Sequence, residues 1–277
     1  MSQSHELQLH ITQMEEIRTI LNSMKNLAFI EAHKLLRFQA MQGQAVANIE
    51  NAAMDFLDFY PLPVTAESTT HICILVGAER GFCGDFNESL INIIAAETYS
   101  GIIAIGSRLR NKLEDSPFEA VSSIEGANVA EEVPDIISRL INTLGTLKDS
   151  RDDFTQTAMQ LTVVYHDNAP NQITQRQILP PFSKQKPEAL HYGNPPLLNL
   201  EPADFFADLV DHYLFAVLHE IFYISLIAEN HSRLQHLEGA IKHLDDETVN
   251  LRRKSQIYRQ EEITEEIEVI LLNAENP

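Results

Sequence analysis

The chain contains no tryptophan, and aromatic residues make up only 7% of its 277 residues. Its two cysteines, Cys73 and Cys83, are too few for the disulfide framework of a small secreted domain, so we expect a reducing compartment. The hydrophobic fraction of 44% argues against disorder and allows one large domain or two smaller ones. The scarcity of aromatics suits helices that pack through leucine, isoleucine, alanine and methionine.

Positive charge is also scarce, because 20 Lys and Arg stand against 40 Asp and Glu, giving a formal net charge of −20. Between residues 201 and 277 there are six basic and 16 acidic side chains. Such a surface repels phosphate backbones, so we expect no nucleic-acid partner. A helix lying on a membrane surface needs Lys and Arg on its polar face, which this sequence does not supply. The acidity fits either solubility in a salty habitat or a complementary basic partner.

Long apolar runs are missing as well. No segment offers about 18 consecutive apolar residues, so the sequence predicts no membrane-spanning helix. The N-terminus has neither the apolar stretch of a signal peptide nor the Arg-rich and Ser-rich composition of a transit peptide. We expect a cytoplasmic chain that reaches a membrane only through its partners.

Two long helical patterns occupy the ends of the chain, over residues 5–58 and 204–273. No proline interrupts residues 1–60, where Gly43 is the one weak point, costing about 1 kcal/mol relative to alanine. Apolar positions in this first helix are Ile11, Met14, Ile17, Leu21, Met24, Ala28, Leu35, Phe38, Met41, Ala45, Ile49 and Phe56. Helices this long cannot be hidden in a domain of this size, so each must find partners along its length.

The last helix carries the seam of a coiled coil, in which each seam residue inserts between four residues of a partner helix. Its positions follow a 3-4-3-4-3 spacing at Leu234, Leu237, Ile241, Leu244, Thr248 and Leu251. The seam then shifts, which marks a local change in winding, and it ends with Ile263, Ile267 and Ile270.

The middle of the chain alternates short strands and helices. Strands are predicted at 70–77, 101–106, 160–166 and 174–179, with the last pairing with the one before it. Helices are predicted from 87 to 98 and over 128–148, the second with Ile136, Ile137, Leu140, Ile141 and Leu144 on its inner face. This rhythm predicts a small, mostly parallel sheet covered by helices, followed by a proline-rich linker over 180–202.

The loop from Gly77 to Gly84 follows a strand and precedes a helix, as phosphate-binding loops do. It lacks both the Gly-Lys-Ser/Thr ending and the G-x-G-x-x-G spacing, so it is interpreted as a tight turn in which Gly81 and Gly84 take positive φ. Cys83 is either a small buried thiol or a nucleophile favoured by Arg80 and by a helix N-terminus.

No metal or acyl-transfer site is predicted. His219-Glu220 resembles the start of a zinc-protease motif, but Tyr223 stands where the second histidine is needed. His243 and Glu247 share a helix face, yet two ligands do not hold zinc by themselves. Ser107 follows a strand without a G-x-S-x-G elbow. We therefore expect no catalytic residue, cofactor-binding residue or metal ligand in this chain.

A basic stretch interrupts the acidic last helix, with Arg252, Arg253 and Lys254 followed by Arg259 and Gln260. These side chains either form ordinary surface ion pairs, for example with Glu247 or Glu262, or contact the carboxylates of a partner.

Three segments resemble the gamma subunit of rotary F-type ATP synthases. The run from Arg259 to Glu266 matches the family signature R-Q-x-x-I-T-x-E, with Arg259, Gln260, Thr264 and Glu266 among its members. The segment 79–87 (ERGFCGDFN) is similar to the family turn D-R-G-L-C-G-G-L-N and contains Arg80, Gly81, Cys83 and Gly84. Ser23-Met24-Lys25, followed by Leu27-Ala28, resembles the K-A-M-K-M-V-A-A helix.

The resemblance implies an α-rich α+β fold, with a long antiparallel coiled coil of the terminal helices and a small Rossmann-like α/β domain. Its parts would be 1–60, 68–202 and 203–277. The family's tip stands inside a ring of three alpha and three beta subunits. Its base binds the epsilon subunit and the membrane ring of c subunits, at the cytoplasmic face of the cell membrane. The nucleotide sites lie in the ring, which makes this chain a non-catalytic rotor subunit that couples ion-driven rotation to ATP synthesis or hydrolysis.

The same resemblance assigns contact roles. Arg259 and Gln260 match positions that contact a beta-subunit loop, and Met24 and Lys25 lie on the facing part of the first helix. Thr264, Glu266, Arg252 and Arg253 are expected to contact partners as well. The chain departs from the family where Phe29 replaces a small alanine and Glu31 and His33 occupy a usually basic segment. Two alternatives stay open, a coiled-coil scaffold with an α/β body and a thiol enzyme that uses Cys83.

Overall fold

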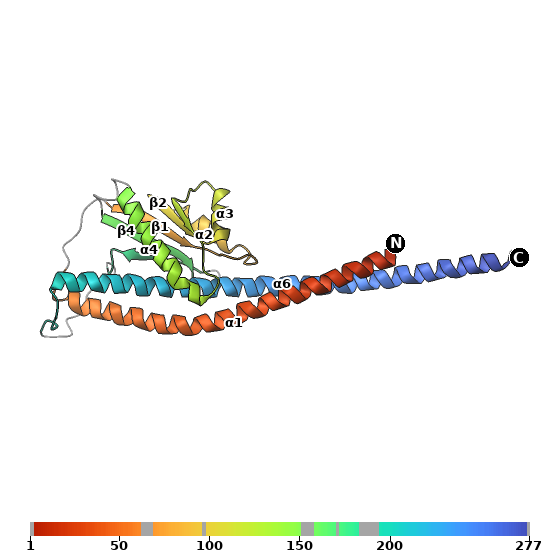
Figure 1. Ribbon diagram of the computed structural model, residues 1–277, viewed down its shortest axis with the longest axis horizontal. Coiled ribbons are helices and arrows are strands. Elements are labelled where there is room, and N and C mark those ends of the chain that lie inside the picture. The colour runs from red at the N-terminus through yellow and green to blue at the C-terminus, as the bar shows by residue number, and fades with distance from the viewer. Residues whose placement is uncertain are drawn as a thin grey trace. The chain divides into compact units, whose positions relative to one another are not determined.

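The computed structural model describes residues 3–61, 69–95, 98–150, 158–169, 172–182 and 194–275 (Figure 1). The chain divides into two compact units. The helical unit comprises Met1–Ala28 and Arg233–Pro277, and the sheet unit comprises Phe29–Ser232. Helices α1 (Gln3–Leu57) and α6 (Pro202–Glu275) contribute residues to both units and confirm the two long helices expected from the sequence.

The sheet unit contains five strands in the order β3-β2-β1-β4-β5. Their bounds are β1 Thr69–Val76, β2 Gly101–Ile105, β3 Ser122–Ile124, β4 Ala158–His166 and β5 Ile173–Leu179. The pairs β1–β2, β1–β4 and β2–β3 are parallel, while β5 is antiparallel to β4. The predicted mostly parallel sheet, including the pairing of its last two strands, is therefore confirmed.

Both faces of the sheet are covered, because successive side chains along a strand point to opposite faces. On one face, Ile72, Ile74 and Val76 of β1 belong to a core with buried residues of α1, α4 (Val133–Ser150) and α6. On the other face, Cys73 and Leu75 pack with buried residues of α2 (Phe86–Ile94) and α3 (Ser107–Glu114). Strands buried on both sides read as continuous apolar runs, which is why the sequence reveals them.

The helical unit is an antiparallel pair, since contacts step down α6 as they step up α1. The backbone N–H of Ser4 donates to Glu262, Glu15 pairs with Arg252, and Arg18 pairs with Asp245. Leu21, Leu237 and Ile241 form its apolar cluster, with Met24, Ala240 and Leu244 against them. The predicted seam on α6 is confirmed, because every member from Leu234 to Leu251 is buried or half-buried.

Some apolar residues of α1 that the sequence pattern assigned to the buried face are exposed. Ile17, Phe38 and Met41 are 46%, 38% and 72% exposed, although the spacing placed them with the core positions. In the helical unit, the face of α1 that packs against α6 consists of Leu7, Ile11, Met14, Arg18 and Leu21. Arg18 could not be assigned to this face from the spacing of apolar residues, because its side chain is charged.

The sequence prediction missed two elements and misplaced the bounds of two others. Helix α3 and strand β3 were not predicted, and α2 ends at Ile94 rather than 98. Helix α4 begins at Val133, after a short 3₁₀ turn at Ala130–Glu132, because Pro134 fits only the first turn of a helix. Ile141, predicted to face inward, is 48% exposed, whereas the predicted Ile136, Ile137 and Leu140 are buried and Leu144 packs against the core. Residues 183–193 of the predicted 180–202 linker lie outside the described residues.

One stretch of α6 bears on the expectation that nothing spans a bilayer. An 18-residue window within Pro202–Leu271 has a mean hydropathy of 1.3, which by length and composition is enough to cross a membrane. However, 61% of that window is buried inside the protein. The buried core helix of a globular protein meets the same criterion, so this window is weak evidence for a membrane span.

Candidate functional site

The turn at residues 79–84 follows β1 and is held by contacts from distant parts of the sheet unit. Glu79 is the main anchor, because its carboxylate accepts hydrogen bonds from the backbone N–H of Ser107 at 2.8 Å and of Gly126 at 2.7 Å. The Ser107 hydroxyl donates a third bond to it at 2.7 Å. The chain segments that follow β1, β2 and β3 are thereby joined at one carboxylate.

The electrostatics of Glu79 favour its charged form. Burial alone would raise the pKa of this carboxyl, but the bonds from Ser107 and Gly126, with Arg110 nearby, leave the pKa below its ordinary value. The N–H of Ser107 belongs to the first turn of α3, where open α/β folds bind anions. In this chain the Glu79 carboxylate binds the N–H of Ser107 in place of an external anion. The absence of a phosphate-binding motif from the loop is consistent with this contact.

The residues of this turn singled out by the sequence lie together. Arg80 donates from Nε to Asn128 Oδ1 at 2.6 Å, and its backbone N–H donates to Glu229 of α6 at 3.5 Å. Gly84 has the expected positive φ of 60°, but the other left-handed residue is Phe82 (φ 64°) rather than Gly81. A Cβ at Gly81 would lie 3.8 Å from the Arg108 guanidinium, so that side chain covers the turn.

Cys83 is buried, and its thiol donates to the carbonyl oxygens of Arg80 and Gly81. These contacts support the interpretation of a packed structural thiol over that of a nucleophile. Next to it, Phe82 is 46% exposed, and Arg80, Arg108 and Arg110 are exposed. Three exposed arginines and an aromatic ring therefore lie on or beside this turn, together with the carboxylates of Glu79 and Asp85.

A serine and a histidine that the sequence analysis did not single out lie near this turn. Ser89 Oγ is 3.2 Å from His166 Nε2, which suggests a nucleophile and its base. The same nitrogen lies 2.7 Å from the carbonyl oxygen of Phe86, which can only accept, so Nε2 carries a proton and cannot take one from Ser89. Burial lowers the pKa of His166, although Phe86 and Asp85 act in the opposite direction. The pair is structural.

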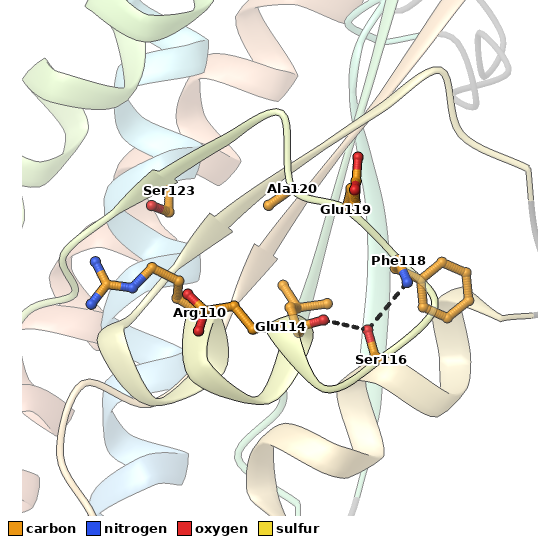
Figure 2. A pocket seen from close by; sticks show the side chains of 8 residues that line it. Arg110, Glu114, Ser116, Phe118, Glu119, Ala120 and Ser123 are labelled. Atoms are coloured by element: carbon orange, nitrogen blue, oxygen red, sulfur yellow. Dashed lines mark hydrogen bonds between the residues drawn. The ribbon is translucent and has the colours of Figure 1, made fainter.

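A pocket of about 460 Å³ lies between α3 and the segment leading into β3 (Figure 2). Arg110, Glu114, Phe118, Glu119 and Ser123 are among its lining residues. The hydroxyl of Ser116 donates to the Leu113 carbonyl and accepts from the backbone N–H of Phe118, so this polar group serves the local turn. Within the described part of the chain, no group of three or more His, Cys, Asp or Glu side chains is arranged to hold a metal ion.

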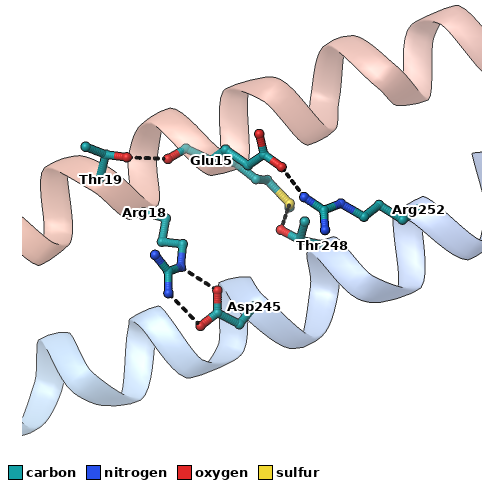
Figure 3. A network of polar contacts seen from close by, with 7 residues as sticks. Glu15, Arg18, Thr19, Asp245, Thr248 and Arg252 are labelled. Atoms are coloured by element: carbon teal, nitrogen blue, oxygen red, sulfur yellow. Dashed lines mark hydrogen bonds and ion pairs between the residues drawn. The ribbon is translucent and has the colours of Figure 1, made fainter.

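The helical unit carries the other predicted contact residues, and Figure 3 shows one of them, Arg252, among the polar contacts between α1 and α6. Arg18 makes a forked contact with Asp245, with 2.6 Å between Nε and Oδ1. Arg252 pairs with Glu15 of α1 rather than with the predicted Glu247 or Glu262, so it contributes to the helix pair itself. Lys25 lies 3.8 Å from Glu238, and Met24 packs against the apolar cluster of Leu21, Leu237 and Ile241.

The signature residues on α6, and Arg253 before them, are exposed to solvent. Arg253, Arg259, Gln260, Thr264 and Glu266 are all exposed. The Thr264 hydroxyl donates to the Gln260 carbonyl at 2.8 Å, one turn back. Beside them, Ile263, Ile267 and Ile270 are 48%, 52% and 65% exposed, so the last part of the predicted seam has no cover within the described chain.

The structure does not bring the two sets of contact residues together. Lys25 lies opposite Glu238, which is 21 residues from Arg259 along the same helix, or about 30 Å. The resemblance located each motif but could not give this separation, because the separation depends on the register of the helix pair.

This combination of an antiparallel helix pair and a doubly covered sheet is the fold of rotor-stalk chains. A chain of the Euglena gracilis mitochondrial ATP synthase rotor matches with a TM-score of 0.63 at 13% identity, over 94% of this chain and 98% of that one. A chain of the Tetrahymena thermophila mitochondrial ATP synthase central stalk and c-ring matches with a TM-score of 0.55 at 15% identity, over 80% and 99%.

Sequence comparison identifies the family to which this chain belongs. The family model described as ATP synthase matches residues 3–275. The ATP synthase gamma chain of Campylobacter concisus is 26% identical over 215 residues, covering 73% of this chain and 71% of that one. That of Clostridium botulinum (strain Langeland) is 26% identical over 217 residues with the same coverage. The chain therefore belongs to the ATP synthase gamma-chain family, as its three motifs indicated.

Glu79→Gln tests the anchor of the turn. The variant should lower the free energy of unfolding by about 1–3 kcal/mol at pH 7. The glutamine amide has one acceptor oxygen for the three hydrogen bonds, and its NH₂ group would face an N–H or O–H donor of Ser107 or Gly126. The folded-state pKa lies below the unfolded value, so this stability is present above the unfolded pKa and is lost as the pH falls through the folded pKa. The difference between the proteins should therefore shrink below about pH 4.

Denaturant unfolding at several pH values measures this difference. Glu125→Gln is the matched control, because the Glu125 side chain is 72% exposed and forms only a surface pair with Arg139. Equal losses for the two variants at pH 7 would show that Glu79 does not anchor the turn.

Proposed function

We infer that this chain is the central-stalk rotor (gamma) subunit of an F-type ATP synthase, and that it couples rotation to ATP synthesis or hydrolysis in partner subunits. The observation that carries this inference is the fold match to a chain of an ATP synthase rotor over 94% of this chain, together with the family-model match over residues 3–275. A non-catalytic role fits the geometry, since Cys83 is packed into its turn and His166 Nε2 is already protonated.

The physical basis of coupling is asymmetry. A single helix pair presents a different side to each of three like catalytic subunits, so each catalytic conformation has its own contact free energy with the stalk at a given angle. Turning the stalk shifts these populations in sequence, and by linkage ATP hydrolysis turns the stalk. The pair must resist bending, and the seam between α1 and α6 in the helical unit, with its cross-helix ion pairs, supplies that stiffness.

The partners that we propose are three alpha and three beta subunits around the stalk, the epsilon subunit, and the membrane ring of c subunits. The chain would then sit at the cytoplasmic face of the cell membrane as a peripheral subunit held by these partners. Related chains lie in assemblies described as rotor and as OSCP, F1 and c-ring, which supports a complex of this kind.

Two surfaces are proposed as partner contacts. The first is the exposed end of α6, where Arg259, Gln260, Thr264, Glu266 and the neighbouring isoleucines face solvent. The second is the exposed cluster of Arg80, Arg108, Arg110 and Phe82, whose guanidinium groups could pair with carboxylates of a partner. Among the remaining predicted residues, Arg252, Lys25 and Met24 already have partners in the helical unit, so we assign them chiefly to the helix pair.

Arg259→Ala tests the first contact. In the assembled complex we expect ATP hydrolysis to fall about tenfold, because removing an arginine that pairs with carboxylates costs about 1.5–3 kcal/mol. The control is Lys254→Ala, which removes an exposed cation of the same helix that lies outside the signature. Steady-state hydrolysis by equal amounts of complex measures the effect, and equal rates for both variants would remove Arg259 from the contact.

Reconstitution tests the function itself. Membrane vesicles carrying the complex should couple ATP hydrolysis to ion pumping, whereas complexes assembled without this chain should not pump. Full pumping without the chain would overturn the proposed function.

A further inference from the structure

Arg176 lies on the edge strand β5 and reaches both long helices within the sheet unit. Its Nη1 donates to Glu220 of α6 at 2.7 Å, and its Nη2 donates to Glu50 of α1 at 3.1 Å. The three side chains are 26%, 15% and 24% exposed, so the contact is largely removed from water. One guanidinium therefore joins the sheet, α1 and α6.

The surroundings are shaped for this contact. A Cβ at Gly43 of α1 would stand 3.1 Å from Glu220 Oε1, so the glycine that weakens the helix makes room for the carboxylate. One residue earlier, Gln42 Nε2 donates to the Ala216 carbonyl of α6 at 3.0 Å. The two helices thus contact each other directly next to Arg176.

Two tyrosines complete the site and keep water away from the charges. Burial raises the pKa of Tyr165 on β4 to about 12, and burial likewise raises the pKa of Tyr213 on α6, so both phenols stay neutral. Burial also disfavours the Arg176 cation, but the hydrogen bond to Glu220 and the neighbouring groups outweigh it, so the pKa of Arg176 is raised. The Arg176 guanidinium therefore keeps its charge across the physiological pH range.

Three other ion pairs of the sheet unit are more exposed and join fewer elements, and a fourth, Lys34 with Glu31, lies within α1 alone. Arg139 and Glu125 are 60% and 72% exposed, and Lys112 and Glu88, which join α3 to α2, are 51% and 52% exposed. Lys34 of α1 contacts Glu131, a surface carboxylate that is 64% exposed. Surface pairs of this kind contribute little, whereas a desolvated, forked arginine contact is directional.

On this basis, and resting on the proposed rotor function, we propose that Arg176 is the positioning residue that locks the sheet to α1 and α6, so that torque passes between the helices and the sheet. The interdigitated apolar core resists movement of the sheet against the helices, but apolar contacts are not directional. A guanidinium with two carboxylates on two different helices adds directional resistance, because a displacement of β5 along the helices strains these two contacts.

The test uses the assembled complex in membrane vesicles with Arg176→Met, which removes the charge while keeping an unbranched chain. Ions pumped per ATP hydrolysed is the readout, because a merely structural role would reduce the amount of complex and both activities together without changing their ratio. We expect the ratio to fall at least about twofold while hydrolysis per complex is kept. Arg176→Lys should fall between this variant and wild type, since an ammonium lacks the fork.

Arg139→Met is the matched control and should leave the ratio unchanged. If Arg176→Met does not assemble, Glu50→Gln weakens one arm and leaves the contact with Glu220, and its ratio should still fall below wild type. An unchanged ratio in whichever of these variants assembles would overturn the proposal. Failure of the rotor function itself would appear differently, as wild-type complexes that pump equally well with and without this chain.

Discussion

Replacing Leu237 with alanine is expected to destabilise the helical unit by about 2–5 kcal/mol, because it leaves a cavity in a small apolar cluster. Leu237 is fully buried and shares that cluster with Leu21 and Ile241. The cluster has few other large apolar side chains, so neighbouring residues have little with which to fill the space. Amide hydrogen exchange along residues 233–251 measures the loss, since it reports local opening independently of the sheet unit.

The control is Gln235→Ala, an exposed position on the same turns of α6 that should change exchange little. A loss of protection confined to the helical unit would show that the seam holds this pair together. Unchanged protection in Leu237→Ala would mean that the cross-helix ion pairs, such as Arg18 with Asp245, hold the helices without the apolar seam.

Gly106→Ala should have the largest effect in the sheet unit. Gly106 has φ 111°, and a Cβ there would lie 2.7 Å from the Ala78 carbonyl oxygen and 2.8 Å from that of Gly77. The strained backbone costs about 1–3 kcal/mol, and the overlap with two backbone atoms adds to this because the backbone cannot move aside as a flexible side chain would. The change also displaces Ser107, whose N–H and hydroxyl bind Glu79.

Gly84→Ala separates these two causes. Gly84 also has a positive φ, of 60°, but a Cβ there meets nothing within 4 Å. Its cost should therefore be about 1 kcal/mol of backbone strain alone. Denaturant unfolding of both variants gives the comparison, and a Gly106→Ala loss no larger than that of Gly84→Ala would contradict the steric account.

The parts of this fold that follow from local pattern were predictable. Thr69–Val76 and Gly101–Ile105 read as strands because both faces are buried, which makes their sequences continuously apolar. The seam from Leu234 to Leu251 could be predicted because the apolar contact positions of a close-packed helix pair repeat every seven residues. The matching face of α1 could not be predicted in this way, because it includes Arg18. Arg18 is held there by Asp245, which lies 227 residues away in the sequence.

Helix α3 and strand β3 were missed for a related reason. Helix α3 has eight residues and directly follows Gly106, a residue type that usually marks a break, while β3 has only three residues. Both are held by distant groups, with Glu79 binding Ser107 and Gly126 from 28 and 47 residues away. Non-local contacts of this kind outweigh weak local preference.

The candidate sites divide in the same way. Short sequence motifs identified Arg259, Gln260 and the turn around Cys83 as candidate sites, because a motif is recognised from consecutive residues alone. The partners of Arg252 and Arg176 needed three-dimensional register, since Glu15 and Glu50 belong to the other end of the chain. The glycine at 43 looked like a defect in sequence, and the structure explains it by the carboxylate of Glu220.

The central claim is that one copy of this chain acts as an asymmetric stalk among three like catalytic subunits. Native mass spectrometry of the complex purified from membranes through an affinity tag on this chain tests it most directly. The account predicts a complex with a single copy of the chain together with three alpha and three beta subunits. A complex with two or three copies, or a homodimer without catalytic subunits, would contradict it.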